Sequence, residues 1–257
     1  MTLMPNASEA PAPSPAEPTV RLGARVILAA ASLVLVAVPF ALLLELIEDR
    51  WPPLLRADRG ARDGLYAFAE THPRFVTAMQ LISDLGSTPL WIAVFAVVVG
   101  WLFWRRLPWL ALFVLVTVVG SSLLNALVKT AVHRVRPVLS HPVAHAHGLS
   151  FPSGHAQSAI VGYAVLLLVF LPILYGAFRR SAVTFAAVMV LAIGFSRIAL
   201  GVHYVSDVVG GFVLGAAWVA AMAAAFNVVG VNRERRVDSA SHRSGLGGDS
   251  FGGTPGR

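Results

Sequence analysis

Long apolar runs separated by short polar segments dominate the sequence. One run covers Val26–Leu46, and five others follow at about Pro89–Trp104, Leu107–Val132, His155–Phe178, Ser181–Leu200 and Tyr204–Val229. A helix that crosses the hydrocarbon core of a bilayer needs about 20 mainly apolar residues. The pattern therefore predicts an all-α integral membrane protein, a bundle of six transmembrane helices.

The connection at residues 50–88 has a different pattern. It carries mixed charge, and its apolar residues recur at roughly helical spacing, at Leu65, Phe68, Phe75, Met79 and Ile82. This spacing predicts one or two amphipathic helices that lie in the membrane interface after the first span.

The two ends of the sequence predict tails. Residues 1–20 are rich in Pro, Ala and Ser, and residues 231–257 are rich in Ser and Gly, so we expect both to be disordered tails on either side of a six-helix transmembrane domain at 21–230. Six spans place both tails on one side. The positive-inside rule favours the cytoplasm for the tails and for two turns that carry Arg105–Arg106 and Arg179–Arg180, in a plasma or inner membrane.

Composition supports this interpretation. Only 13% of the residues are charged, whereas a soluble domain has about 25%. The chain has no cysteine, which excludes disulfides and cysteine metal sites. The net charge of +7 comes from basic residues scattered at the ends of apolar runs, a distribution that favours a membrane and not a nucleic acid as partner.

Residues 196–207, SRIALGVHYVSD, contain the first candidate chemistry. His203 and Asp207 are four residues apart and would share one face of a helix. The carboxylate could then accept the Nδ1–H of the imidazole and leave Nε2 free as a nucleophile. Arg197 offers a planar fork of donors suited to phosphoryl oxygens. The alternative is an interfacial Arg, His and Asp that cap two membrane helices.

Two further segments carry polar residues at predicted span ends. Lys129 lies seven residues before Arg136, two helical turns away, with Pro137 ending the helix. Both cations could face one pocket, or both could simply extend to the interface from a helix end.

The other segment is FPSGHAQS. Ser153 is placed to cap a helix start, and Gly154 permits close approach of a ligand to the free N–H groups there. His155 would point from the first turn into the same space. The alternative is an ordinary helix cap followed by a solvated histidine.

The segments KTAVHRVRP, PSGH and SRIALGVHYVSD occur in this order, each at a predicted span end on one side. Together they match the pattern KxxxxxxRP, PSGH, SRxxxxxHxxxD at every fixed position, so the chain resembles the type 2 phosphatidic acid phosphatase family over about residues 25–230. The resemblance implies that His203 attacks phosphorus and forms a phosphohistidine, that Asp207 orients His203, and that His155 protonates the leaving oxygen. It also implies that the phosphoryl oxygens are held by Lys129, Arg136, Ser153, Gly154 and Arg197, without a metal or other cofactor.

Several polar residues stay outside these roles. We interpret His141, His145 and His147 as part of a solvated or lid-like loop, not as metal ligands, because no acidic residue or cysteine accompanies them. His133 and Arg134 occupy variable positions of the first motif, so a direct role is open and unsupported.

Two features bear on packing between helices. Asn125 either supports Lys129 or bonds another helix. Gly211 and Gly215 form a GxxxG pattern, which we expect to pack inside the bundle and not at a dimer interface.

These features predict a membrane lipid phosphatase whose active site opens at the extracytoplasmic face. By family analogy, the expected substrates are undecaprenyl diphosphate first, then phosphatidylglycerophosphate or phosphatidic acid. The alternative is a membrane protein that binds or transports lipid phosphates without catalysis. The related vanadium haloperoxidases are soluble, and the hydropathy of this chain does not fit them. The sequence does not predict an oligomeric state.

Overall fold

The structure is a computed structural model that describes residues 38–137, 144 and 148–226. Within these residues every regular element is a helix and no strand occurs, which confirms the all-α prediction. Residues 38–48 are helical. The later elements are α2 Pro52–Thr71, α3 Pro73–Asp84, α4 Thr88–Trp104, α5 Pro108–Val132, α6 Gly154–Phe170, the 3₁₀ helix η1 Leu171–Ile173, α7 Gly176–Ala199 and α8 Val205–Ala225.

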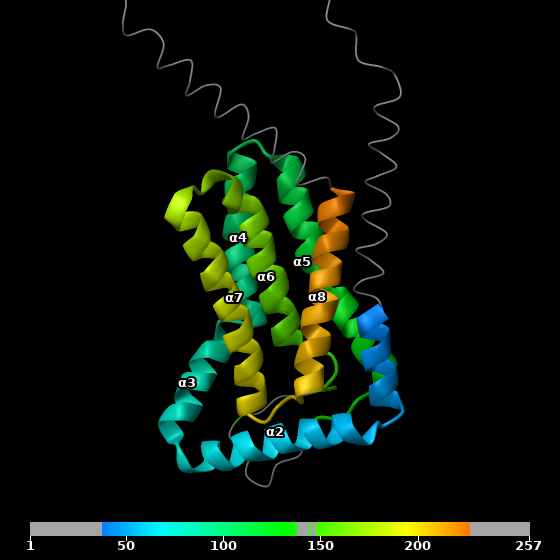
Figure 1. Ribbon diagram of the computed structural model, residues 1–257. Helices are drawn as coiled ribbons and strands as arrows, with labels where there is room; N and C mark the ends of the chain where they lie inside the picture. The colour runs from blue at the N-terminus through cyan, green and yellow to red at the C-terminus, as the bar shows by residue number, and fades with distance from the viewer. Residues whose placement is uncertain (1–37, 138–143, 145–147, 227–257) are drawn as a thin grey trace, which may run out of the picture.

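Helices α4 to α8 stand side by side as a bundle, and α2 crosses one end of it (Figure 1). Helix α3 slants from the end of α2 towards the start of α4 (Figure 1). Helix α6 is in contact with α4, α5, α7 and α8, so it is the central helix. The connection at residues 50–88 thus contains two helices, as its spacing predicts, and α2 covers one end of the bundle.

Among the described residues, five segments are long and apolar enough to cross a membrane: Pro73–Trp104, Pro108–Val132, Gly154–Ile173, Gly176–Ala199 and Val205–Ala225. The first of these combines α3 and α4 and is longer than the predicted span at Pro89–Trp104. Most of the predicted span at Val26–Leu46 lies outside the described residues, as do both predicted tails. The count of six spans therefore stays a prediction.

The surface of the bundle is apolar and its interior contains polar groups. Large apolar side chains such as Leu123, Leu127, Phe185 and Leu191 are exposed, whereas Gln157 is almost fully buried. The extent of exposed apolar surface is unusual for a soluble protein and is typical of helices whose outer faces contact lipid.

One predicted span end is wrong. Helix α6 ends at Phe170 and not at Phe178, because Pro172 lacks the N–H that would continue the α-helical hydrogen bonds, and the chain passes into the 3₁₀ helix η1. Helix α7 then begins at Gly176, so Arg179 and Arg180 lie in this helix and not in a turn. The other predicted turn, at Arg105 and Arg106, follows α4 as expected.

The GxxxG glycines pack inside the bundle, as predicted. A Cβ atom added to Gly211 would lie 2.6 Å from the carbonyl oxygen of Ser153, and one added to Gly215 would lie 3.1 Å from the carbonyl oxygen of Gln157. Only glycine permits this approach of α8 to α6. The backbone at the start of α6 is therefore held directly against α8.

Asn125 bonds a neighbouring helix, which settles the alternative left open by the sequence. Its Nδ2 donates to Gln157 Oε1 at 2.7 Å. Gln157 Nε2 in turn donates to the backbone oxygen and to Oγ of Ser121, both at 2.9 Å. This buried network joins α5 to α6 one turn before Lys129.

Candidate active site

The three motif segments meet at the end of the bundle that α2 crosses. There α5 and α7 end and α6 and α8 begin (Figure 1). His155 interacts electrostatically with His203 and with the three cations Arg197, Arg136 and Lys129. Residues that are far apart in the sequence thus form one cationic site with two imidazoles.

His203 lies beside Asp207, although the two do not share a helical face as predicted. Helix α8 begins at Val205, so His203 lies in the preceding loop and does not share a helical face with Asp207. Gly201, with φ of +70°, turns the chain between α7 and α8 and permits this placement. His203 Nδ1 still lies 3.3 Å from Asp207 Oδ2, and both side chains are buried.

Arg136 fixes the tautomer of His203. Arg136 Nη1 lies 3.0 Å from His203 Nε2. A guanidinium can only donate, so Nε2 accepts and carries no proton. The proton is therefore on Nδ1, where it faces Asp207, and Nε2 has the unprotonated lone pair that a nucleophile needs.

The imidazole of His203 is neutral over a wide pH range. Burial lowers its pKa to about 4, because desolvation penalises the charged form and the charges of Arg136 and Arg197 act in the same direction. The hydrogen bond and charge of Asp207 oppose this shift without reversing it. His203 is only 1% exposed, which accounts for the dominance of desolvation.

Arg136 does not share a helix with Lys129, which corrects the second geometric prediction. Helix α5 ends at Val132, and His133 adopts a left-handed conformation with φ of +51°. Pro137 has no N–H to bond the carbonyl of His133, so the helix cannot continue to it. Arg136 reaches the site from the extended segment beyond α5, where Nη1 donates to the backbone oxygen of Val202 at 2.9 Å.

Arg197 is a buried donor that is only partly paired. It lies in the last turn of α7, and its Nη1 donates to Oγ of Ser83 on α3 at 2.5 Å. Its Nε is buried and has no hydrogen-bond partner within the described part of the chain. A buried N–H without a partner costs free energy, so this atom indicates a place for an anionic ligand.

The PSGH segment forms the start of α6, as predicted. Ser153 is the N-cap, and its Oγ accepts from the N–H of Ala156 at 3.4 Å. Gly154 is the first helical residue, half-buried, with the side chain of Asn125 as its near neighbour. His155 follows in the first turn, next to Gly86 at the junction of α3 and α4.

Sequence reasoning missed two side chains that hold Asp207. Its Oδ1 accepts from Arg134 Nη1 at 2.6 Å, and its Oδ2 accepts from Oγ of Ser150. Arg134 was noted only as a variable position of the motif, and no pattern distinguished Ser150 from other loop serines. His141, His145 and His147 lie outside the described residues.

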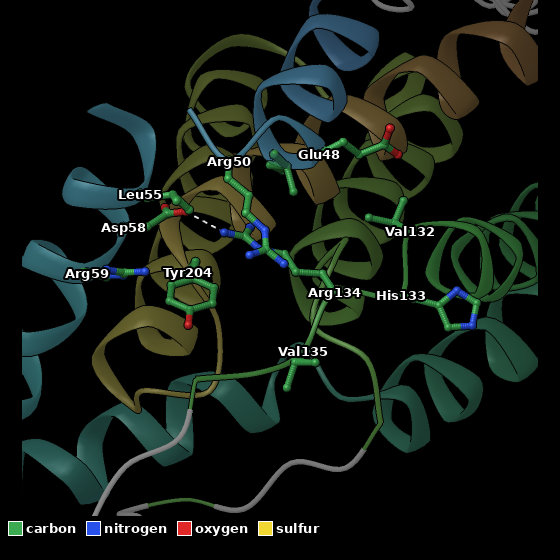
Figure 2. A pocket seen from close by; sticks show the side chains of 11 residues that line it. Glu48, Arg50, Leu55, Asp58, Arg59, Val132, His133, Arg134, Val135 and Tyr204 are labelled. Carbon is green, nitrogen blue, oxygen red and sulfur yellow. Dashed lines mark hydrogen bonds and ion pairs between the residues drawn. The ribbon is translucent and has the colours of Figure 1, made fainter. Parts of the chain in front are cut away.

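A pocket of about 580 Å³ lies beside the site, between residues 38–48, α2 and the end of α5 (Figure 2). Neither His155 nor His203 lines it, so the pocket is separate from the candidate active site. Arg134 and Asp58 line it and point toward one another from different elements (Figure 2). These two residues separate the pocket from Asp207.

Comparisons of the sequence with known proteins point to the same family as the three motifs. Residues 109–230 match the PAP2 superfamily. Phosphatidylglycerophosphatase B of Bacillus subtilis is 35% identical over 140 residues, which cover 53% of this chain and 68% of that protein. A lipid A 1-phosphatase of Rhizobium etli is 34% identical over 116 residues, 42% of this chain and 46% of that protein.

A solved structure extends the likeness to most of the fold. The crystal structure of a transmembrane PAP2-type phosphatidylglycerolphosphate phosphatase from Bacillus subtilis matches with a TM-score of 0.67 and 29% identity, over 79% of this chain and 96% of that chain. By these relatives and by the three motifs that its bundle brings together, the chain belongs to the PAP2 superfamily and is most similar in kind to membrane lipid phosphatases.

Proposed function

We propose that this chain hydrolyses a lipid phosphate through a covalent phosphohistidine at His203. The observation that carries the proposal is the pairing of His203, whose Nε2 accepts from Arg136 while its Nδ1 faces Asp207. In this arrangement the imidazole of His203 is neutral, and its Nε2 lone pair points at the guanidinium of Arg136. A phosphoryl group would bind beside that cation.

In the first step, the Nε2 lone pair of His203 attacks phosphorus, and the bond from phosphorus to the lipid oxygen breaks. His155 donates a proton to that oxygen, which leaves as an alcohol or, from a diphosphate, as a lipid monophosphate. Asp207 accepts the Nδ1–H and stabilises the positive charge that develops on the ring of His203.

In the second step, water replaces the imidazole at phosphorus. The neutral His155 removes one proton from the water as its oxygen bonds to phosphorus, and the P–N bond to His203 breaks. Inorganic phosphate leaves, His203 is again neutral, and His155 is again protonated for the next cycle. His155 therefore alternates between acid and base.

The oxygens of the transferred phosphoryl group would bind Lys129, Arg136 and Arg197 together with the start of α6 at Ser153 and Gly154. The partnerless Nε of Arg197 supports this assignment, since a phosphoryl oxygen would supply its missing acceptor. Three cations and helix-start amides provide the charge stabilisation that the scheme requires, so it includes no metal step.

The substrate is a proposal at the level of lipid class. The similarity to phosphatidylglycerophosphatase B makes phosphatidylglycerophosphate the first lipid to test. Undecaprenyl diphosphate, placed first by family analogy, and phosphatidic acid stay predictions. We further propose that the site faces the extracytoplasmic side, with both termini in the cytoplasm.

The test is phosphate release by the detergent-purified chain from each of these three lipids in the presence of EDTA. We expect release by the wild-type protein and none by His203→Ala. Release that requires an added divalent metal would contradict the metal-independent scheme. Saturable lipid binding without any release would support the alternative of a binding or transport protein.

A further inference from the structure

We propose that Arg134 and Asp58 are positioning residues, which act on the reaction by holding the carboxylate of Asp207 in the orientation that His203 needs. The inference rests on the proposed function, because it concerns the same histidine. Neither residue occupies a fixed position of the three motifs.

Asp58 is the anchor of this arrangement. It is one of two buried residues in α2 and is fully inaccessible to solvent. Its Oδ1 accepts the backbone N–H of Ser206 at 3.0 Å, and its Oδ2 accepts from Oγ of Ser206 and from Arg134 Nη2. The carboxylate of Asp58 on α2 thus caps the first turn of α8 at Ser206. Ser206 lies two residues after Tyr204, which directly follows His203 in the sequence.

Arg134 connects that anchor to Asp207. Its Nη2 lies 2.8 Å from Asp58 Oδ2, the pair joined by the dashed line in Figure 2, and its Nη1 lies 2.6 Å from Asp207 Oδ1. The guanidinium also lies over the ring of Tyr204, with Cζ 4.5 Å from the ring centroid. Two buried carboxylates and one aromatic ring therefore hold a single planar cation in place.

The two oxygens of Asp207 have separate partners. Oδ1 faces Arg134, whereas Oδ2 faces His203 Nδ1 and accepts the backbone N–H of Tyr204 at 2.9 Å. Without Arg134, Oδ1 would be buried without its charged partner, and the carboxylate would lose the contact that fixes its plane. The hydrogen bond to His203 would then lose its direction, although both residues would still be present.

A purely structural ion pair would look similar in the static structure, so the test must measure catalysis through Asp207. We expect Arg134→Gln to lower kcat by about 10–100-fold, the usual effect of residues that support a functional group, with little change in KM. In an Asp207→Asn background the same change should cause little further loss of kcat, because Arg134 acts only through that carboxylate.

The pH profile gives a second readout that a structural role would not move. His203 is surrounded by Asp207 of α8, Arg136 beyond α5, Arg197 of α7 and His155 of α6. Removing Arg134 misdirects the hydrogen bond from His203 to Asp207, and this bond is the larger of the two Asp207 contributions that raise the pKa of His203. We therefore expect the acid limb of kcat/KM to shift to lower pH in Arg134→Gln.

Matched controls lie close by. Arg59→Gln and Asp63→Asn each remove an exposed charge from α2 and should leave kcat, KM and the pH profile unchanged. Asp58→Asn should lower kcat less than Arg134→Gln and should not add to it in the double variant. If Arg134→Gln fails to fold, Arg134→Lys and Asp58→Asn carry the same comparison.

The two proposals fail differently. If the wild type hydrolyses lipid phosphates and His203→Ala does not, yet Arg134→Gln keeps its kcat and pH profile, the positioning role is wrong and the proposed function stands. An equal loss of kcat in the wild-type and Asp207→Asn backgrounds would also overturn the role, since Arg134 would then act elsewhere. A fully active His203→Ala would instead contradict the proposed function itself.

Discussion

At the scale of single residues, the site combines one buried neutral imidazole with donors that lack full pairing. His203 is neutral because burial outweighs the attraction of Asp207. The buried Nε–H of Arg197 donates a hydrogen bond to none of the described residues. Such groups are costly in a protein that serves only as a scaffold, and useful in one that binds a phosphoryl group.

The pKa of His203 predicts the acid side of the pH profile. Because this pKa is lowered to about 4, the imidazole stays unprotonated until the pH falls to that value, and protonation below it removes the nucleophile. We expect kcat/KM to rise with pH through about 4, measured with a short-chain phosphate whose own titration is known. An acid limb near 6.5, the ordinary histidine value, would mean that His203 is solvated.

Arg197 supplies a second prediction. Arg197→Lys keeps the charge but removes the buried Nε–H and the planar fork, so kcat should fall by about 10²–10³, or about 2.7–4 kcal/mol in the barrier, as for other oxyanion donors. Steady-state kinetics on the purified protein measure this. Arg180→Lys, at an exposed position of the same helix, is the control. A Lys variant with wild-type kcat would exclude Nε as a donor to the reacting group.

Much of the candidate site follows from the sequence at this scale, because the three motifs name the residues that the bundle brings together and predict their chemistry. The supporting residues do not follow. Asp58 lies in a charged segment next to Asp63, and only the fold shows that one is buried and the other exposed. Nothing in the local pattern separates them, since their difference depends on contacts with α8.

At the scale of elements, the site depends on how closely α8 approaches α6. Gly211 faces the carbonyl oxygen of Ser153, and the N–H of Ser153 donates to the carbonyl oxygen of Asp207 at 2.9 Å. The start of α6, which carries Gly154 and His155, is thereby fixed relative to the start of α8. Packing of these two helices sets the distance between the PSGH segment and Asp207.

Gly211→Ala tests this dependence. Its Cβ would lie 2.6 Å from a backbone oxygen, so the helices must move apart, at a cost of about 1–3 kcal/mol. We expect a lower midpoint of thermal unfolding in detergent and a lower kcat. Gly100→Ala, where an added Cβ meets nothing within 4 Å, should change neither. Equal midpoints for the two variants would show that the contact is not tight in solution.

Hydropathy predicts the helices but not their ends. The apolar run that follows His155 continues past Pro172, so hydropathy alone predicts an end for α6 that lies beyond the observed one. Likewise, the spacing of His203 and Asp207 predicts that both lie on one helix. In the structure His203 lies in a loop, and the turn at Gly201 brings it close to Asp207. In both cases, proline and glycine backbone constraints outweigh side-chain periodicity.

At the scale of the whole molecule, α2 crosses one end of the bundle (Figure 1), and the candidate site lies at this end, where α5 and α7 end and α6 and α8 begin. A polar site at the end of an apolar bundle suits a lipid whose phosphate lies at the interface and whose chains stay in the bilayer. The side of the membrane on which this end lies is a prediction from charge distribution.

The absence of cysteine makes that prediction simple to test. Arg74→Cys, at the start of α3, and Arg105→Cys, in the turn after α4, place single exposed thiols at opposite ends of the bundle. In intact cells, a membrane-impermeant maleimide should label Arg74→Cys, and it should label Arg105→Cys only after permeabilisation. The reverse pattern would place the site in the cytoplasm.

The most direct test of the account is to trap and locate the covalent intermediate. Purified protein is mixed with a phosphate-labelled lipid, quenched with base within a single turnover and digested for mass spectrometry. The account predicts an acid-labile, base-stable phosphohistidine at His203, which His203→Ala lacks. Product formation in that turnover with no phosphorylated enzyme, or with the phosphoryl group on another residue, would contradict it.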